Sequence, residues 1–458
     1  MKIVAVLCAK IVFCILRFFK KGATTLPGKV ALFFYKPILK SVSKGVRVIL
    51  VTGTNGKTTT CRIIEKEMII SGKNYFINRS GANLLSGIVT AFIIHCNIFG
   101  KCKKDTAIIE CDENAFNQVS KFLEPEIIVV TNIFKDQLDR YCEVTGTLSV
   151  IEKSVLRCRN STVILNADCP LTYSISKKIN NNNVLTFGVE RGAYQHFPGK
   201  ENSDAPNCIF CGSQYKYNYS VYSHLGGFFC ENCGYKREQP DVFVSKIFSL
   251  DSDCSCVKMN VFDKKAVVNL EGIYNVYNSL AAVAALLSFG EKRENIYEAI
   301  SSFDGAFGRC ETFEMPECFA KIMLVKNPAG FSLVNSQIEN EAQMFNSFKI
   351  CFCLNDNIAD GRDISWIYDV DFDGIKNVKN KISDIYVCGS RAYEMALCLK
   401  LNGFDESKIK LIERENYKIL PKIAKASKEN FYIVPTYTSM MSLRPFFAKE
   451  FDKKEFYN

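Results

Sequence analysis

Residues 51–60 read VTGTNGKTTT, and they directly follow the apolar run Val46–Val51. A strand, a tight loop and then a helix starting near Lys57 and Thr58 create a nest of backbone N–H groups at a helix N-terminus. Such a nest binds the phosphates of a nucleoside triphosphate. The stretch therefore predicts a nucleotide-binding α/β domain, and the rest of the chain is interpreted around it.

The residue types of this loop suit the binding of ATP and Mg²⁺. Glycines let the backbone approach phosphate oxygens, Lys57 is expected to neutralise the β- and γ-phosphates, and the Thr58 hydroxyl is expected to coordinate Mg²⁺. The first glycine of the general phosphate-loop pattern would fall at Val51, so the loop has the shorter form T-G-T-N-G-K-T. An accidental turn is the weaker alternative, because strand and helix both flank the loop. The predicted nucleotide-binding residues are Gly53, Thr54, Asn55, Gly56, Lys57, Thr58 and Thr59.

The composition is that of a globular protein with more than one domain. The chain has 458 residues, 48% of them hydrophobic, which allows two or three domains, each with its own core. Its 21 cysteines are scattered through apparent strands and helices, which favours the reducing cytoplasm over a secreted disulfide framework. The formal net charge of +10 fits solubility, an anionic substrate or an anionic membrane surface, and does not choose among them.

The N-terminal segment is strongly apolar. Residues 3–19 read IVAVLCAKIVFCILRFF, but Lys10 and Arg17 interrupt the run, which is shorter than the roughly 20 apolar residues of a membrane-spanning helix. No small-residue cleavage site follows it, so a secretory signal is not expected. We expect an amphipathic helix that packs on the protein or lies on the inner face of the plasma membrane, with packing favoured of these two, and a true anchor is the weaker alternative.

Short apolar strands alternate with helices after residue 45. This pattern predicts a parallel sheet covered by helices on both faces, with ligands bound at the carboxyl ends of the strands. The elements expected around this sheet are the strands Val46–Val51, Thr106–Glu110, Glu126–Thr131, Ser161–Asn166 and Val184–Phe187 and the helices Thr58–Ile70 and Gly272–Phe289. Those expected nearer the C-terminus are the strands Lys321–Val325, Lys349–Leu354 and Ile382–Cys388 and the helix Arg391–Leu401.

These patterns divide the chain into three regions. An apolar and basic helical segment covers residues 1–45, a central ATP-binding domain covers residues 46–312, and a smaller α/β C-terminal domain covers residues 313–458. The Gly-rich connector Phe303–Glu311 is interpreted as the hinge before the last domain. Spacing and composition change at residues 200–240, which indicates an insertion in the central domain.

The insertion carries two cysteine pairs with metal-ligand spacing. The pairs are 18 residues apart, C-x₂-C-x₁₈-C-x₂-C, and a glycine follows each pair to permit a tight knuckle. Four thiolates close the tetrahedral sphere of Zn²⁺, so the site is predicted to be structural. The alternative is four unrelated thiols in a Cys-rich chain. The predicted zinc ligands are Cys208, Cys211, Cys230 and Cys233.

Aromatic and basic side chains are interleaved within this insertion: Tyr215, Tyr217, Tyr219, Tyr222, Phe228 and Phe229 beside Lys216, Lys236 and Arg237. Such residues stack on bases in nucleic-acid-binding proteins, but more often they fill the small core that a ribbon otherwise lacks. We therefore predict a zinc ribbon with no nucleic-acid partner. His224 lies between the two cysteine pairs and is expected to be a solvated loop histidine instead of a further ligand.

Five further segments follow in a characteristic order. They are Glu110–Glu113 (ECDE), Thr131–Asp139 (TNIFKDQLD), Leu165–Asp168 (LNAD), Gly272–Ala282 (GIYNVYNSLAA) and Phe307–Glu311 (FGRCE). Together with the phosphate loop they resemble the central domain of the Mur ligases, ATP-dependent enzymes that form amide bonds in peptidoglycan precursors. A narrower resemblance, over nearly the whole chain, is to the MurT family, the Mur-ligase-type subunits of lipid II isoglutaminyl synthase. It rests on the ribbon and on Thr24–Gly28 (TTLPG), Thr131–Tyr141 (TNIFKDQLDRY), Lys326–Phe331 (KNPAGF) and Asn355–Asp369 (NDNIADGRDISWIYD).

The resemblance implies ATP-dependent amidation of the α-carboxylate of the D-glutamate in lipid II, which gives D-isoglutamine. A carboxylate is a poor electrophile, so transfer of the γ-phosphoryl group would first make it an acyl phosphate, and ammonia would then attack. Lys57, as a catalytic residue, and Mg²⁺ would stabilise charge on the transferring group. About 45 residues precede the phosphate-loop strand, too few for the usual domain that grips a UDP-sugar, so a soluble UDP-linked substrate is not expected.

The resemblance also implies roles for residues around the nucleotide. The Mur pattern puts the Mg²⁺-binding carboxylate on Glu110, and Glu113 is close enough that both are kept beside Thr58. Asn275 and Arg309 match Mur positions near the nucleotide. Without the resemblance, these two would be a polar residue on a helix face and a solvated loop charge.

The segment Asp360–Trp366 is implied to face the nucleotide and the acyl phosphate. One aspartate there is implied to orient or deprotonate the incoming ammonia, a general-base task. Asp360 and Asp363 are the catalytic candidates, and Asp369 is a further alternative. Read without the resemblance, an Asp-Gly-x-Asp cluster is usually a turn.

The chain lacks the signature of a glutaminase. Class I glutaminases carry a nucleophilic Cys in a G-x-C-x-G elbow with a partner His, whereas this sequence has no such elbow and only three histidines. The resemblance implies that a separate GatD-type glutaminase forms a heterodimer with this chain and supplies ammonia, with lipid II as the membrane-bound substrate. Three other functions are considered: a ligase that adds an amino acid, a nucleic-acid-associated NTPase and a non-catalytic nucleotide-binding scaffold.

Overall fold

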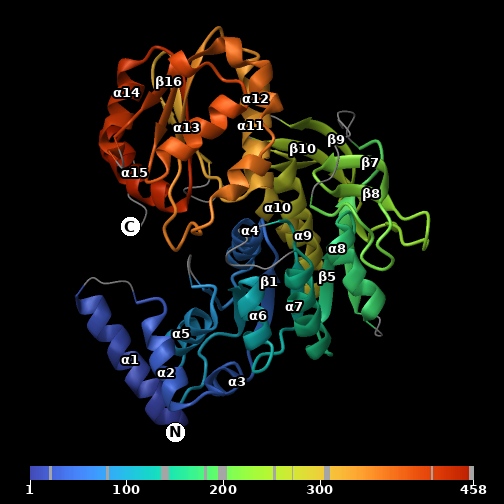
Figure 1. Cartoon of the computed structure of the whole chain (residues 1–458). Helices are drawn as coiled ribbons and strands as arrows, with labels where there is room; N and C mark the ends of the chain where they lie inside the picture. Colours follow the sequence, from blue (N-terminus) through green and yellow to red (C-terminus); the bar gives the residue numbers. More distant parts are fainter. Residues whose placement is uncertain are drawn as a thin grey trace. The chain divides into compact units, whose positions relative to one another are not determined.

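The computed structural model describes residues 1–19, 23–78, 82–135, 144–179, 183–193, 204–250, 254–270, 272–303, 310–413 and 416–452. They form two compact units, drawn in Figure 1: Met1–Phe134 with Val144–Asp304, and Lys135–Glu143 with Gly305–Asn458. The domain boundaries expected from the sequence, after residues 45 and 312, stay a prediction.

The first unit is built on a nine-stranded sheet with the order β11-β10-β9-β6-β5-β4-β1-β3-β2. Its strands are β1 (Arg47–Thr52), β2 (Tyr75–Ile77), β3 (Thr106–Glu110), β4 (Ile127–Val130), β5 (Thr162–Asn166), β6 (Val184–Val189), β9 (Val242–Leu250), β10 (Ser255–Met259) and β11 (Ala266–Val268). Strands β2 to β9 in this order pair in parallel, whereas β10 is antiparallel to both of its neighbours. The predicted parallel sheet is confirmed, and an antiparallel edge that the sequence analysis did not predict extends it.

Strand β1 lies at the switch point of this sheet. It pairs with β3 on one side and with β4 on the other. The strands that follow β1 in the sequence therefore lie on both sides of it, β2 and β3 on one side and β4, β5 and β6 on the other. Ile49, Leu50 and Val51 are fully buried, as expected for a parallel strand with helices on both faces. In such a sheet a crevice opens at the carboxyl end of the switch-point strand.

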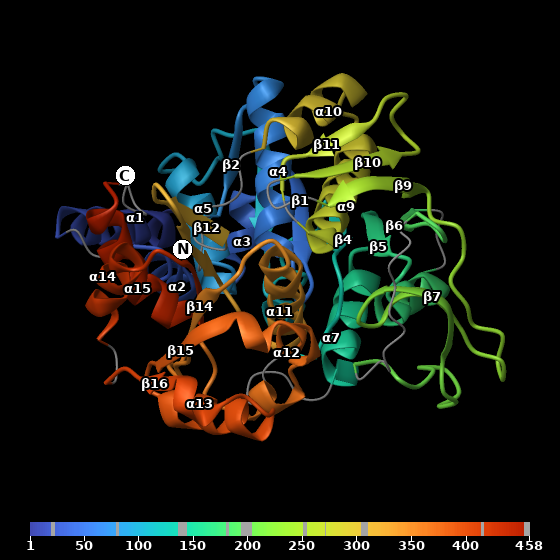
Figure 2. The same ribbon diagram turned by 90° about the horizontal axis from the view of Figure 1, so that it is seen from above.

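Two helical layers enclose the sheet, and Figure 2 shows them from above. Helices α4 (Lys57–Ile70), α9 (Ile273–Phe289) and α10 (Arg293–Ser301) pack on one another along one face. In the other layer, α6 (Glu113–Val119) packs on both α5 (Leu85–His95) and α7 (Val144–Arg157). The short helix α8 (Pro170–Ser174) follows β5.

Three further helices precede the sheet: α1 (Lys2–Phe18), α2 (Leu26–Phe34) and α3 (Ile38–Val42). Helix α1 packs on α2 and α5 through Ala5, Val6 and Ala9, each of which is fully buried. The expected N-terminal helix is therefore present, and one of its faces packs on the protein. Within the described part of the chain, every helix is too short or too polar to cross a bilayer.

The insertion forms a hairpin of β7 (Lys216–Tyr222) and β8 (Leu225–Phe229). Tyr215, Phe228 and Tyr235 fill a small apolar cluster between this hairpin and α8, which supplies Tyr173. The prediction that aromatic residues form the core of the ribbon is therefore confirmed for Tyr215 and Phe228.

The second unit is a smaller α/β layer structure. Its sheet has the order β12-β13-β17-β14-β15-β16, parallel except for the β12–β13 pair. The strands are β12 (Cys310–Glu314), β13 (Phe319–Met323), β14 (Phe348–Cys353), β15 (Ile382–Cys388), β16 (Ile409–Leu411) and β17 (Asn430–Pro435). Helices α11 (Pro328–Ala342), α12 (Asp373–Asn377) and α13 (Ala392–Leu401) share one apolar core with it, and α14 (Leu420–Ala426) and α15 (Tyr437–Glu450) share a second.

Candidate nucleotide site and metal centre

The loop between β1 and α4 requires glycine at two positions. Gly53 and Gly56 have φ angles of +120° and +83°, which other residues rarely adopt. A Cβ atom on Gly56 would lie 1.9 Å from Asn278 Oδ1, and one on Gly53 would lie 2.4 Å from the Thr131 hydroxyl. The tight turn brings the N-terminus of α4 to the carboxyl end of β1, where a helix N-terminus favours an anion.

The segment that follows β4 holds this loop in place. Asn132 O accepts from Thr54 N at 2.9 Å, and Asn132 Oδ1 accepts from Asn55 N at 2.8 Å. Asn55 O in turn accepts from Asn132 Nδ2 at 3.1 Å and from the Thr131 hydroxyl at 2.7 Å. Phe134 N donates to Thr54 Oγ1 at 3.0 Å. The neighbouring strands β1 and β4 thus end in two segments that fix each other.

Lys57 is buried and paired within this loop. Its Nζ lies 3.1 Å from Glu113 Oε1 and donates to Gly53 O at 2.5 Å. Burial lowers the pKa of Lys57, but the carboxylates of Glu113, Asp112 and Glu110 outweigh burial and raise the pKa above its ordinary value. The lysine is therefore a cation held at the N-terminus of α4, as the phosphate-loop interpretation requires.

The two acidic candidates for Mg²⁺ lie at the end of the neighbouring strand. Glu110 ends β3, where its carbonyl accepts from Asn78 Nδ2 and its N–H donates to Asn78 Oδ1, both at 2.8 Å. Glu113 begins α6, whose first turn donates two backbone N–H groups to the Asp112 side chain. With the half-buried Thr58 at the start of α4, the site offers carboxylate and hydroxyl oxygens, the ligands that Mg²⁺ prefers.

Helix α9 supplies two asparagines next to the loop, of which the sequence analysis singled out one. Asn278 Nδ2 donates to the predicted residue Asn275 at 3.0 Å, and the Asn278 carbonyl accepts from the Thr60 hydroxyl at 3.4 Å. The side chain of Asn278 also occupies the space beside Gly56. The sequence did contain a signal for Asn278, because it follows Asn275 by three residues and so lies on the same face of the helix.

A buried carboxylate connects the insertion to the sheet. Asp168 follows β5, is fully buried and accepts from Arg237 Nε (2.6 Å), Tyr277 Oη (2.5 Å) and Val189 N (2.7 Å). Burial raises the pKa of Asp168, against the opposing effect of these partners. Arg237 belongs to the insertion and Tyr277 to α9, so one side chain ties three parts of the first unit together.

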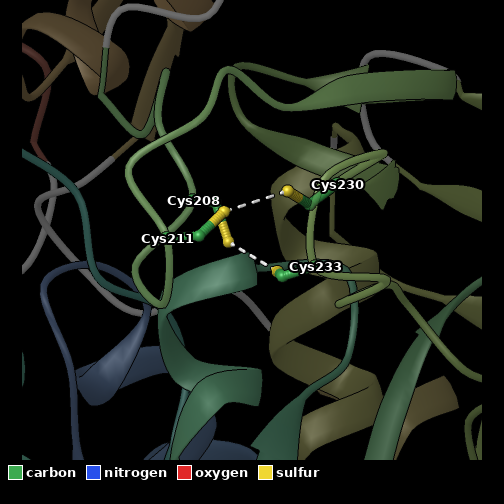
Figure 3. A group of neighbouring side chains, drawn as sticks. All are labelled: Cys208, Cys211, Cys230 and Cys233. Atoms are coloured by element: carbon green, nitrogen blue, oxygen red, sulfur yellow. Dashed lines mark hydrogen bonds between the residues drawn. The ribbon is translucent and has the colours of Figure 1, made fainter.

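Figure 3 shows the four predicted zinc ligands facing one another from two knuckles. The Sγ atoms of Cys208 and Cys233 are 3.5 Å apart, those of Cys211 and Cys230 are 3.4 Å apart, and all four lie within 4.8 Å of one another. In tetrahedral zinc–thiolate coordination with bonds of about 2.3 Å, the sulfurs are about 3.8 Å apart. The glycine after each pair has a φ of +75°, which makes the knuckle. The donor set and its spacing therefore fit a structural Zn²⁺ ion.

A second thiol cluster lies in the core of the other unit. Cys351, Cys353 and Cys388 come from β14 and β15, their sulfurs are 3.1–4.0 Å apart, and each is at most 1% exposed. Burial raises the pKa of the Cys351 and Cys353 thiols. They lie among apolar side chains such as Leu443, and they pack there as small neutral groups.

The tip of the ribbon hairpin reaches the segment that clamps the phosphate loop. The ring of Phe134 stacks on Tyr222 at 5.6 Å and contacts His224 at 4.5 Å between centroids. His224 is fully buried, with Nε2 3.2 Å from Cys169 Sγ, so the expectation of a solvated histidine was wrong. The hairpin tip packs inside the first unit instead of pointing into solvent, which the sequence spacing did not reveal. Because Phe134 N donates to Thr54 Oγ1, this one residue contacts both the insertion and the phosphate loop.

The three candidate aspartates of the second unit have different surroundings. Asp360 is 4% exposed, and it accepts from Thr438 N at 2.8 Å and from the Thr438 hydroxyl. Asp363 is half-buried and accepts from Ser365 N at 2.8 Å, while Asp369 is exposed. Burial raises the pKa of Asp360. A hydrogen-bonded turn ends at Asp360, whose N–H donates to Asn357 O at 2.8 Å, and of the three aspartates only Asp360 is deeply buried.

Two known protein families match most of the described residues. The Mur ligase middle domain family matches residues 51–233, which include the phosphate loop, the carboxylates and the four cysteines. The MurT ligase C-terminal family matches residues 324–440, which include the aspartate segment.

The chain is also similar to curated proteins along most of its length. It is 34% identical over 433 residues to the MurT subunit of lipid II isoglutaminyl synthase (glutamine-hydrolyzing) of Streptococcus pneumoniae (strain ATCC BAA-255 / R6), covering 93% of this chain and 92% of that protein. This chain belongs to the MurT family of Mur ligases. A MurT subunit of Staphylococcus aureus (strain COL) is 33% identical over 425 residues, with 92% of each protein covered.

Solved structures show that this MurT-family chain has the Mur ligase fold. A pseudomurein peptide ligase type C from Methanothermus fervidus superposes with a TM-score of 0.67 at 21% identity, covering 90% of this chain and 80% of that one. MurF from Acinetobacter baumannii gives a TM-score of 0.64 at 17% identity, covering 93% and 81%. At these identities the likeness concerns the fold alone, and it confirms the predicted α/β architecture.

Some predicted positions of the MurT-family chain lie outside the described residues. Arg309 is one of them, together with Phe307 and Gly308 of the same motif, so its role stays a prediction. The same holds for residues 136–141, the later part of the segment that begins with Thr131. The other predicted nucleotide and magnesium residues lie together in the first unit, and Asp360 and Asp363 lie in the second.

His224 of this MurT-family chain is expected to make the stability depend on pH. Burial lowers its pKa from 6.5 to about 3, and Asp204 Oδ2, at 3.9 Å from Nδ1, is too far away for a hydrogen bond. The buried, neutral His224 therefore contributes fully to the free energy of unfolding above about pH 6.5. This contribution is lost as the pH falls towards 3, because only the unfolded state takes up the proton. Between about pH 7.5 and pH 5 we expect a loss of about 2 kcal/mol in the free energy of unfolding.

Urea denaturation of the wild type and of His224→Phe at both pH values measures how much His224 contributes to this loss in the free energy of unfolding. The variant should lose about 2 kcal/mol less than the wild type over this interval. Acid release of zinc affects both proteins equally and cancels in the comparison. Equal losses would show that His224 titrates normally and is not buried in the folded state.

Proposed function

We propose that this chain is the ligase subunit of an enzyme that amidates lipid II during peptidoglycan synthesis, with ATP as the source of free energy. The reaction converts the α-carboxylate of the D-glutamate into the amide of D-isoglutamine. The observation that carries the proposal is the 34% identity, over 93% of the chain, to a pneumococcal protein named as the MurT subunit of lipid II isoglutaminyl synthase (glutamine-hydrolyzing). A phosphate loop with a buried, charged Lys57 supports it.

The proposed reaction has two steps. A carboxylate oxygen of the substrate takes the γ-phosphoryl group of ATP, which gives an acyl phosphate and ADP. Ammonia then attacks the acyl carbon, phosphate leaves, and the nitrogen loses a proton to give the neutral amide. The protein contributes mainly by positioning and by stabilising charge on the transferring group. Lys57, which the loop carbonyl of Gly53 and the carboxylate of Glu113 hold in place, is the proposed cationic group.

Oxygen ligands for Mg²⁺ are proposed at the same edge of the sheet. Thr58 and the carboxylates Glu110 and Glu113 would hold the ion, which supplies positive charge at the β- and γ-phosphates. Asn275 and Arg309 stay proposed nucleotide contacts on the strength of the family pattern. Asn278 joins them, because its side chain borders Gly56 directly. The four cysteines of the ribbon are proposed to hold a structural Zn²⁺.

The second unit is proposed to supply the group that receives a proton from ammonia. Asp360 is buried, and both of its carboxylate oxygens accept hydrogen bonds from Thr438 at the start of α15. A carboxylate in that position stabilises the helix N-terminus. Asp363 is half-buried and follows Asp360 by three residues. We therefore assign Asp360 to holding the loop and Asp363 to orienting ammonia.

Two asparagine substitutions separate these roles. Asp360→Asn weakens charge-assisted hydrogen bonds and should lower the free energy of unfolding by roughly 1–3 kcal/mol. Asp363→Asn should leave stability within about 0.5 kcal/mol but reduce kcat with ammonium by about 10²-fold. Asp405→Asn is a matched control, because Asp405 also accepts from the backbone N–H two residues later, at 2.9 Å. A stable Asp360→Asn variant with the larger kcat defect would reverse the assignment.

Ammonia is proposed to come from a partner. The sequence has no G-x-C-x-G elbow, so a GatD-type glutaminase bound to this chain in the cytoplasm is the proposed source. The word subunit in the names of the curated relatives supports a partner of some kind.

Mass spectrometry of lipid II after incubation with the chain tests the reaction. With ATP and a high concentration of ammonium, the chain alone should replace one hydroxyl of lipid II by an amino group. With glutamine it should do so only when a co-purified glutaminase is added. Lys57→Ala should reduce either reaction by about 10²-fold or more, whereas Lys66→Ala, which removes the same charge from the same helix, should not.

Other outcomes of this experiment would contradict the proposal. Addition of the mass of an amino acid would indicate an amino-acid-adding ligase. Binding of oligonucleotides with a steep salt dependence, and no change in lipid II, would indicate a nucleic-acid-associated NTPase. ATP binding without turnover would indicate a scaffold.

A further inference from the structure

One face of α1 is both apolar and exposed. Val4, Leu7, Ile11, Ile15 and Phe18 follow one another at intervals of three or four residues, so they share one side of the helix. Their side chains are between 39% and 82% exposed. The opposite side of α1 is already used for packing on α2 and α5. The helix is therefore apolar on two sides, one more than its packing within the protein requires.

Neighbouring parts of the first unit add to this exposed apolar surface. Phe33 of α2 is 84% exposed, and α2 lies beside α1 (Figure 1). Phe99 is 63% exposed on the loop after α5, and Gly100 of that loop lies against Lys2 of α1, because a Cβ there would be 2.5 Å from the Lys2 Cε. Exposed aromatic and aliphatic side chains gathered in one region mark a surface that meets a partner or a membrane.

The charge of the same region is one-sided. Residues 1–45 contain nine of the 58 basic residues and none of the 48 acidic residues. This tenth of the chain thus carries +9 of the formal net charge of +10, and the remaining residues are almost balanced. On α1 itself, Lys10 and Arg17 lie one position before Ile11 and Phe18, at the border of the apolar face. An apolar face with a basic border is the pattern of a helix that lies in the interface of an anionic membrane.

We propose that the exposed face of α1, with its basic border, docks the protein on the surface of an anionic lipid bilayer. The apolar side chains enter the headgroup region while Lys10 and Arg17 contact lipid phosphates. A second copy of this chain is a poorer occupant, because it would bring a like charge of +9 against this face. No described helix spans a membrane, so the association is interfacial and reversible. The proposal does not depend on which reaction the nucleotide site performs.

Vesicle flotation with the full chain tests the docking surface in the absence of nucleotide. Vesicles of phosphatidylglycerol mixed with phosphatidylcholine should bind the chain about tenfold or more tightly than vesicles of phosphatidylcholine alone, and salt should weaken the difference. The double variant Ile11→Glu and Phe18→Glu should lose this binding by about tenfold or more. Both positions are exposed, so its ATP turnover in solution should match that of the wild type.

Two controls make the result specific. Leu401→Glu changes a leucine that is 69% exposed on α13, and it should leave vesicle binding unchanged. Lys10→Gln with Arg17→Gln should weaken binding to the anionic vesicles more than binding to neutral ones. Equal binding of the wild type and the Ile11→Glu, Phe18→Glu variant would overturn the proposal. So would a dimer in sedimentation velocity that this double variant abolishes, because a second copy would then cover the face.

Discussion

The phosphate loop exists only because two glycines adopt backbone conformations that other residues avoid, and because neighbouring segments hold them there. The space next to Gly56 is filled by Asn278, and that next to Gly53 by Thr131. Hydrogen bonds from the segment after β4 fix Thr54 and Asn55 on both sides. A loop that is already ordered loses little further entropy when an anion binds. The entropic cost of ordering the loop therefore does not weaken anion binding.

The ribbon insertion is connected to the phosphate loop through side-chain contacts. Its Arg237 neutralises the buried Asp168, and its hairpin tip packs on Phe134, the residue whose N–H bonds to Thr54. A ribbon of this size has a small apolar core, so four thiolates around one ion would supply much of its stability. The four-cysteine site and the phosphate loop are therefore linked through packing, although the cysteines are far from the loop in sequence.

The sequence predicted what depends on local pattern and missed what depends on packing. The loop, the parallel strands and the four cysteines follow from spacing and from apolar runs, and the structure reproduces the strand Thr106–Glu110 residue for residue. The burial of His224 and the contact of Asn278 with Gly56 depend on which hairpin or helix packs nearby, and no local spacing encodes that. The antiparallel β10 and β11 were missed because they extend the sheet beyond its regular alternation of strands and helices.

Calorimetric titration of Mg²⁺-ATP into Gly56→Ala tests most directly whether this loop is the nucleotide site. The added methyl group would collide with Asn278, so affinity should fall by about tenfold or more while the protein stays folded by circular dichroism. Gly403→Ala is the matched control, because Gly403 has a φ of +81° but open space around it. It should bind like the wild type. No heat of binding to the wild type, or undiminished affinity in Gly56→Ala, would contradict the account.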